Sequence, residues 1–325
     1  MRPMTQSARG FRAAVLIGWV ALGAAGVVYA RLKNIPSPAA ARVLAAFLIA
    51  YPFYLVPAFA DLRERLKGAT LPLFLAASAL APYLAAYAVT GQWQWSGLGR
   101  LAALALTLGL WYRILPAKPA TDAAFLVLIA AVLIGKYFDP IYPAPYPGLK
   151  IAVLGHIALI SMSVLVLMVA RRVPETGFGF LPNWREWRIG ALHYLGFLPV
   201  AVLVALPLHA VRLAPQPAPL WKIAGTFLAF LLVQALFEEF LVRGVLQQWM
   251  EEWMRNRTAA LWLTSAVFGL AHLWFANFPF PNWRWALLAG GLGWFCGHAR
   301  NQAGSIRAGV VTHALAVTTW RAFFA

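Results

Sequence analysis

The stretch "LFEEFLVRGVLQQW", residues 236–249, places two adjacent carboxylates and an arginine inside a run of otherwise apolar residues. It closes an apolar segment near 221–249, which is long enough to cross a bilayer as a helix. A charge at the middle of a bilayer costs at least about 2.5–3.5 kcal/mol on insertion scales, so that it normally faces a partner or a cavity. The charged side chains of this stretch, Glu238, Glu239 and Arg243, are therefore candidates for function.

The composition of the whole chain predicts an all-α, polytopic membrane protein. Hydrophobic residues make up 62% of the 325 residues and charged residues only 11%, whereas soluble domains contain about a quarter charged residues. The apolar runs are about 17–25 residues long, as helices that cross a bilayer require. We predict about eleven such spans. They lie near 11–30, 40–60, 70–90, 98–115, 122–138, 149–170, 190–210, 221–249, 258–275, 283–300 and 305–322.

The distribution of charge argues for membrane lipid as a partner and against nucleic acid. The formal net charge is +17, but the basic residues are scattered at the ends of apolar runs rather than clustered. At these positions they bias the orientation of the chain and meet anionic headgroups. The single cysteine, Cys296, excludes an internal disulfide and any CxxC motif.

One polar segment predicts how the chain is organised. Residues 171–190, "RRVPETGFGFLPNWREWRIG", contain proline, glycine and several charges, and they interrupt the series of apolar runs. We therefore predict an N-terminal six-helix membrane region at 1–172 and a C-terminal region at 173–325. The unusual ionisable residues within apolar runs all lie after this polar segment.

Helix geometry assigns different directions to the two adjacent glutamates. Glu239 and Arg243 are four residues apart and share a helix face, so that they are expected to form an ion pair. Glu238 points about 100° away and is left for another task. The alternative is a buried network that only holds helices together, which explains the pair but not the extra carboxylate.

Two histidines in later apolar runs are the expected partners of Glu238. His272 closes "FGLAH" and His313 lies in "VVTHALAV". A lone histidine in such a run usually serves packing, but three ionisable groups on three spans suggest a site where they converge around a polar cavity. A carboxylate and two imidazoles can activate water without a metal, or they can ligate zinc. The HExxH signature of many zinc peptidases is absent, and the spacing leaves both chemistries open.

The motifs themselves resemble those of a known family. "EEFLVR" fits EExxxR, "FGLAH" fits FxxxH, and a histidine follows in the next but one apolar run. This order is similar to the CPBP family of intramembrane glutamic endopeptidases, which includes the type II CAAX prenyl endopeptidases and bacterial Abi-type proteins. The resemblance covers roughly residues 175–325 and implies a protease core in the C-terminal region.

The resemblance also implies roles for individual residues. Glu238 would be the general base, His272 would position the water, and His313 would donate a hydrogen bond to the oxyanion. Glu239 and Arg243 would shape the site. The resemblance implies no metal and no other cofactor.

The chain departs from the family pattern at one position. The family usually ends with HxxxN or HxxxD, whereas Val317 stands four residues after His313. Valine has no polar donor, so that half of the expected oxyanion hole is absent or supplied elsewhere. The ending at 305–320, "SIRAGVVTHALAVTTW", also resembles CAAX-protease-related proteins found beside bacterial exosortase systems, which implies a multi-pass protein of the bacterial inner membrane.

The sequence therefore predicts an intramembrane peptidase, a glutamic hydrolase that cleaves a peptide bond in a membrane-associated protein or peptide. The alternative is a non-catalytic membrane scaffold, immunity or maturation factor that keeps the protease fold, and Val317 favours that alternative. A transporter would also explain buried charges, but we find no inverted repeat between the two halves.

Overall fold

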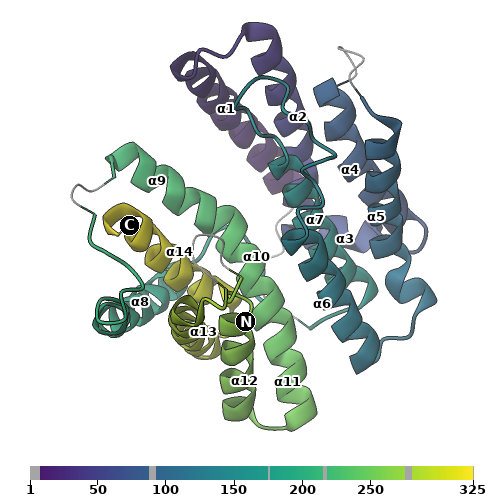
Figure 1. Ribbon diagram of the computed structural model, residues 1–325. Coiled ribbons are helices and arrows are strands. Elements are labelled where there is room, and N and C mark those ends of the chain that lie inside the picture. Colours follow the sequence, from purple (N-terminus) through teal and green to yellow (C-terminus); the bar gives the residue numbers. More distant parts are fainter. Residues whose placement is uncertain (1–7, 88–92, 175, 215–217, 275–279, 325) are drawn as a thin grey trace. The chain divides into compact units, whose positions relative to one another are not determined.

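The computed structural model of the chain describes residues 8–87, 93–174, 176–214, 218–274 and 280–324. Within these ranges the structure is helical and contains no strand, apart from an isolated bridge between Leu213 and Phe324. This confirms the all-α prediction. The chain divides into two compact units, Met1–Pro174 and Glu175–Ala325, and each unit is described by itself (Figure 1).

The prediction of several membrane spans is also confirmed. Six helical segments among the described residues are long and apolar enough to cross a membrane. The other predicted spans contain helices that are shorter, less apolar or more charged, so that the number eleven stays a prediction. The six segments are Arg9–Leu32, Ser37–Ala58, Thr70–Tyr87, Val153–Ala170, Trp184–Ala205 and Leu220–Met254.

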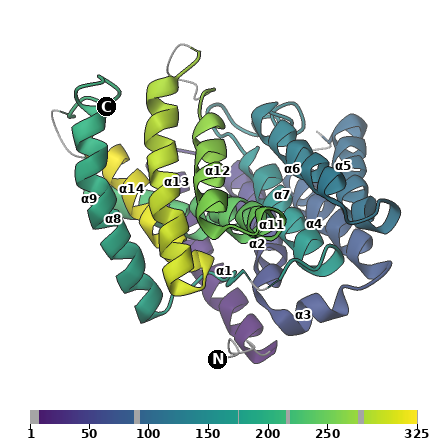
Figure 2. The same ribbon diagram turned by 90° about the horizontal axis from the view of Figure 1, so that it is seen from below.

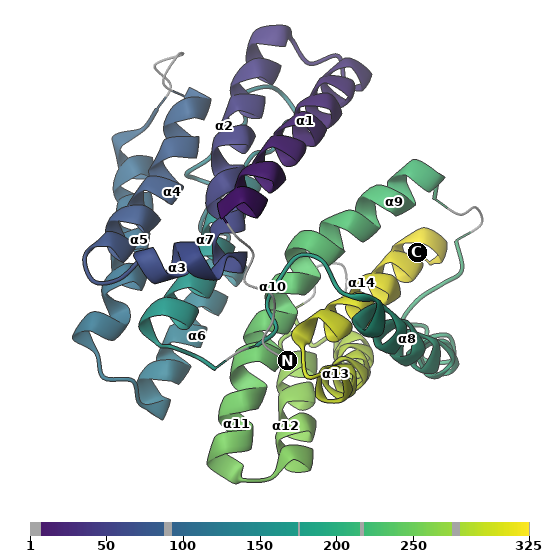
Figure 3. The same ribbon diagram turned by 180° about the vertical axis from the view of Figure 1, so that it is seen from behind.

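Unit 1 is a bundle in which α2 packs against α1, α4 and α7, and α4 also packs against α5 (Figure 3). Its elements are α1 (Ala8–Leu32), α2 (Ser37–Leu55), η1 (Val56–Ala58), α3 (Ala60–Arg65), α4 (Thr70–Tyr87), α5 (Trp95–Ile114), α6 (Pro119–Ile134), α7 (Val153–Leu165) and η3 (Val166–Ala170).

An ion pair with a buried carboxylate joins the C-terminal end of unit 1 to α6. The Asp122 carboxylate, in the first turn of α6, is fully buried and accepts hydrogen bonds of 2.8 Å from both Nε and Nη2 of Arg171. The Tyr112 hydroxyl on α5 donates a third bond of 2.9 Å. An acidic residue in a first turn also meets the positive end of the helix dipole. These contacts join α5, α6 and the residue that follows η3.

Unit 2 contains the charged stretch, in a nearly continuous helical rod over Leu220–Met254 that includes two π-helical segments. Its helices α8, α13 and α14 pack against one another, and α12 packs against α11 and α13 (Figure 2). The elements are α8 (Trp184–Ala205), α9 (Leu220–Ala229), η4 (Phe230–Gln234), α10 (Ala235–Glu239), η5 (Phe240–Leu246), α11 (Gln247–Met254), α12 (Arg257–Leu270), α13 (Trp283–Ala303) and α14 (Ile306–Phe323).

Capping residues fix α14 against α8. Asn183 and Glu186 form a reciprocal capping box at the start of α8, and the Glu186 carboxylate also binds Arg307 of α14 at 2.8 Å. At Gly190 the two helices approach so closely that a Cβ would lie 2.6 Å from the carbonyl oxygen of Ala308. The position of α14, which carries His313, is therefore determined by the sequence of α8.

We predict that the stability of unit 1 depends on the Arg171–Asp122 pair. Arg171→Met leaves a buried carboxylate without its cation and should lower the free energy of unfolding by about 3–5 kcal/mol. Tyr112→Phe removes one neutral hydrogen-bond donor and should cost about 1 kcal/mol. Thermal loss of helical circular dichroism in detergent measures both variants. If Arg171→Met and Tyr112→Phe lowered the free energy of unfolding by the same small amount, the Arg171–Asp122 pair would not be buried in solution.

Candidate active site

The rod of unit 2 separates its two adjacent glutamates by burial. Glu239, the last residue of α10, has a fully buried side chain, whereas the Glu238 side chain is 27% exposed. Arg243, in η5, is also buried and places Nη1 3.2 Å from Oε1 of Glu239. The ion pair expected from the four-residue spacing is thus present. The π-helical turn that carries Arg243 is a rare element that often occurs at functional sites.

His313 of α14 binds the same buried carboxylate. Its Nδ1 lies 2.9 Å from Oε1 of Glu239, and the imidazole is buried. Because an ionised carboxylate only accepts hydrogen bonds, Nδ1 carries the proton and donates. Glu239 Oε1 therefore joins the guanidinium of Arg243 to the imidazole of His313.

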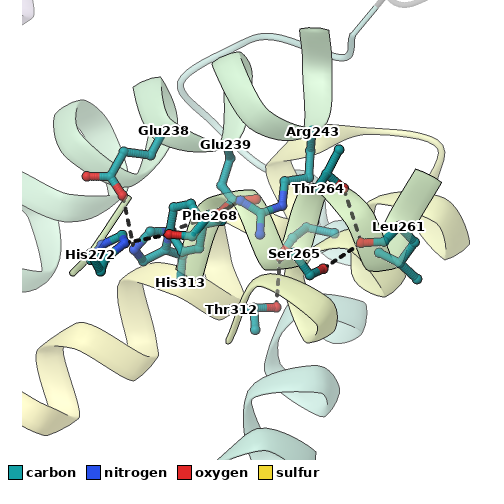
Figure 4. A network of polar contacts seen from close by, with 11 residues as sticks. Glu238, Glu239, Arg243, Leu261, Thr264, Ser265, Phe268, His272, Thr312 and His313 are labelled. Carbon is teal, nitrogen blue, oxygen red and sulfur yellow. Dashed lines mark hydrogen bonds and ion pairs between the residues drawn. The ribbon is translucent and has the colours of Figure 1, made fainter. Parts of the chain in front are cut away.

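The second nitrogen of His313 faces Glu238. Its Nε2 lies 3.7 Å from Oε2 of Glu238, which is a close electrostatic contact but too long for a hydrogen bond. The other oxygen of Glu238 accepts a bond of 3.1 Å from Nε2 of Gln234, one turn earlier on the rod. His313 is thus held between the two glutamates, and Figure 4 shows Glu238 pointing toward the imidazoles of His313 and His272.

His272, in the turn that follows α12, has a fixed tautomer. Its Nδ1 donates a bond of 2.8 Å to the carbonyl oxygen of Phe268, because a carbonyl oxygen can only accept. In the neutral ring, Nε2 therefore carries a lone pair. The described ranges thus bring Glu238, Glu239, Arg243 and His313 into direct contact, with His272 beside them in Figure 4.

Phe268 is a site residue that the sequence argument did not single out. Its ring centroid lies 4.7 Å from that of His272 and 5.7 Å from that of His313. The guanidinium carbon of Arg243 lies 4.5 Å from the same centroid. The signal was present, because Phe268 is the phenylalanine of the FxxxH motif. One aromatic side chain orients three ionisable ones.

Two glycines make room for the buried charges. A Cβ at Gly293 of α13 would lie 2.8 Å from Nη2 of Arg243, and one at Gly309 of α14 would lie 3.0 Å from Oε2 of Glu239. Real Cβ atoms are rarely found so close to a neighbour, so a larger residue would displace the ion pair. Both neighbouring helices therefore approach the charged groups at positions without a side chain.

A cavity of about 110 Å³ adjoins the site. It lies between α8, α12, α13 and α14, and His272, His313 and Val317 all contribute to its wall. We predicted that the ionisable groups would surround a polar cavity, but most of the wall is apolar. The reason is that α14 lines the cavity with the helical series His313, Val317 and Trp320, of which only the first is ionisable.

One group of side chains has the chemistry of a metal site. Glu239, Cys296 and His313 are buried, and their potential ligand atoms lie within 4.8 Å of one another. Carboxylate, thiolate and imidazole all bind zinc. However, Glu239 already accepts hydrogen bonds from His313 and from Arg243, whose positive charge would repel a metal ion. We therefore assign these contacts to a hydrogen-bonded ion network. The zinc alternative predicted from the sequence used Glu238 and His272 together with His313, whereas this group uses Glu239 and Cys296.

The fold and the site together define a class of protein, a multi-pass helical membrane protein with an internal cluster of ionisable residues. Unit 2 belongs to a multi-pass helical membrane protein and holds glutamates and histidines together in its interior. Residues 220–319, which include all five predicted site residues, match the family model described as type II CAAX prenyl endopeptidase Rce1-like. This match supports the resemblance of the region to the CPBP family, and it makes the region similar to CAAX-type intramembrane proteases.

The other two comparisons gave no match, either among curated proteins or among solved structures. The association with exosortase systems and the location in a bacterial inner membrane stay predictions.

We predict that Arg243 stabilises unit 2 through Glu239. Arg243→Met leaves the Glu239 carboxylate buried without its cation and should lower the free energy of unfolding by about 3–5 kcal/mol. The matched control is Arg257→Met. The Arg257 side chain is 76% exposed, and its ion pair with Glu251 is a loose one, with Nε 3.8 Å from Oε2. Exposed pairs contribute about 0–1 kcal/mol. Heat-induced labelling of the buried thiol of Cys296 reports unfolding of this unit. Equal midpoints for both variants would contradict the assignment.

Proposed function

We propose that this protein is an intramembrane peptidase that hydrolyses a peptide bond in a membrane-associated protein or peptide. Unit 2 is the protease core in this proposal, and the membrane is a bacterial inner membrane. The observation that carries the proposal is the position of His313 between two glutamates, within the region that matches a family of endopeptidases. A network that served only to join helices would not need Glu238, whose carboxylate is partly exposed.

Glu238 is the proposed general base. Its carboxylate takes one proton from a water molecule while the lone pair on Nε2 of His272 accepts a hydrogen bond from the other. The water oxygen then attacks the carbonyl carbon of the peptide bond. Glu238 finally passes the proton to the leaving amine, as a general base does in the reverse step.

His313 is the proposed oxyanion donor. Its Nδ1–H is already committed to Glu239, so Nε2 can donate to the oxyanion only when the ring carries both protons. In that form, which is part of the proposal, two cations face the carboxylates of Glu238 and Glu239. Donors that are oriented before the reaction stabilise an oxyanion without reorganisation. Arg243 and Glu239 are positioning residues in this scheme.

We predict that Glu238→Gln abolishes measurable cleavage. The amide keeps the shape of the side chain but cannot take the proton, and general-base catalysis typically contributes about 10²–10⁴-fold. Glu252→Gln, on the exposed end of the same rod, is the matched control and should cleave like the wild type. The measurement is proteolysis of membrane-anchored peptides by purified protein in liposomes, with and without EDTA.

Three outcomes would contradict the mechanism or the proposed function. Full activity in Glu238→Gln would exclude this carboxylate as the base. Loss of wild-type activity in EDTA, with recovery on adding zinc, would assign the reaction to a metal instead. Cleavage by none of the proteins across a broad peptide panel would favour a non-catalytic scaffold, immunity or maturation factor.

We also predict that Val317→Asn raises turnover. His313 and Val317 line the same cavity and are one helical turn apart, so an asparagine amide can reach the region served by His313. A second oxyanion donor is worth about 10²–10³-fold in rate. The kcat of cleavage should therefore rise, whereas Val317→Leu, which adds no donor, should not raise it. A fall in kcat for Val317→Asn would show that another donor already completes the oxyanion hole.

A further inference from the structure

The apolar cavity begins at the catalytic histidines and follows one face of α14. His313, Val317 and Trp320 lie at helical spacings of four and three residues, and all three line it. Seven residues of helix correspond to roughly 10 Å. The cavity therefore extends from the point where a scissile carbonyl would bind into the interior of unit 2.

The wall of the cavity accepts an apolar group and offers little to a polar one. Phe197 of α8 and Leu292 of α13 line its sides. Trp285 and Trp320 also line it, and their ring centroids are 4.4 Å apart. The hydroxyl of Thr319, another lining residue, is already hydrogen-bonded to Tyr194 at 2.7 Å. The two histidines are the ionisable residues of this wall.

The size of the cavity limits what can enter it. Its volume of about 110 Å³ is smaller than the ~150 Å³ of an engineered apolar cavity that binds benzene. A single aliphatic side chain of the size of leucine therefore fits, whereas the benzyl group of phenylalanine, which is larger than benzene, does not. A polyisoprenoid or acyl chain is several times larger than benzene and would not fit inside.

We propose that this cavity receives the side chain of the substrate residue whose carbonyl is attacked, and that this residue is apolar and of the size of leucine. This inference rests on the proposed function, and it implies that cleavage requires no prenyl group. Val317 is the specificity-determining residue, because it continues the apolar wall to His313 where an asparagine or aspartate would place a polar group.

The test varies both the peptide and the cavity. Membrane-anchored peptides carry alanine, leucine, phenylalanine or S-farnesylcysteine before the scissile bond, and kcat/KM is measured for each. Differences of one methylene in an apolar pocket correspond to about 10–200-fold. We expect leucine to exceed both alanine and phenylalanine by at least about tenfold, and S-farnesylcysteine to give no advantage.

Two variants change the volume in opposite directions. Ala289→Leu, on the α13 wall, fills the cavity and should shift the preference toward alanine. Val317→Ala enlarges it and should shift the preference toward phenylalanine. The matched control is Ala266→Leu, on the exposed side of α12, which should leave the order unchanged. Equal loss with all peptides in both cavity variants, or preference for S-farnesylcysteine in the wild type, would overturn the proposal.

A binding measurement separates this proposal from the proposed function. A peptide with a photoreactive leucine at the same position is cross-linked to the Glu238→Gln protein, in which no hydrolysis is required. Attachment to α13 or α14, reduced by Ala289→Leu, supports the pocket even if no peptide is cleaved. Cleavage by the wild type without such attachment would refute the pocket and leave the peptidase assignment intact. Attachment that an excess of lipid abolishes would assign the cavity to an acyl chain and also refute the proposal.

Discussion

The buried carboxylate of Glu239 is the constraint on which the rest of unit 2 depends. An ionised group without water must be paired and hydrogen-bonded, because an unpaired buried charge is strongly destabilising. The rod supplies one partner, Arg243, from its own next turn, and α14 supplies the other, His313. Gly293 and Gly309 let the neighbouring helices approach these groups. A single charge therefore determines where three helices can meet.

This pairing gives two adjacent residues different environments. A helix rotates each successive side chain by about 100°, so that Glu239 faces the interior while Glu238 keeps 27% of its surface exposed. The buried carboxylate can hold His313 in place because it is never available to water. The partly exposed carboxylate of Glu238 is the proposed base. Under the proposed function, the doubled glutamate thus divides structure from chemistry within one helical turn.

The sequence was sufficient to predict features that depend on local geometry. Apolar runs predicted the helices, and the four-residue spacing predicted the pair of Glu239 and Arg243. From the sequence we expected His313 to pair with Glu238, however, and the hydrogen bond of its imidazole goes to Glu239, while Glu238 lies 3.7 Å away. The choice between adjacent carboxylates depends on how α14 is rotated about its axis. That rotation is set by distant contacts such as those of Glu186 and Gly190, which periodicity does not report.

The apolar cavity was missed for a related reason. Each helix that forms the cavity contributes apolar residues, and a single sequence does not distinguish these from residues that face lipid or the core. The cavity arises only where the helices come together. Val317 is the clearest example of a residue whose place in the cavity wall cannot be inferred from the sequence alone. From the sequence it is a lost oxyanion donor, whereas in the structure it is also part of a wall that can bind a substrate side chain.

These two descriptions of Val317 have different kinetic consequences under the proposed function. A missing oxyanion donor weakens only the transition state, by about 2.7–4 kcal/mol. An apolar side chain in a pocket gains about 1.5–3 kcal/mol from burial, but it gains this in the bound substrate as well as in the transition state. Binding of that kind lowers KM and leaves kcat unchanged. Under the proposed function, valine at this position therefore favours selective capture of an apolar residue over rapid turnover.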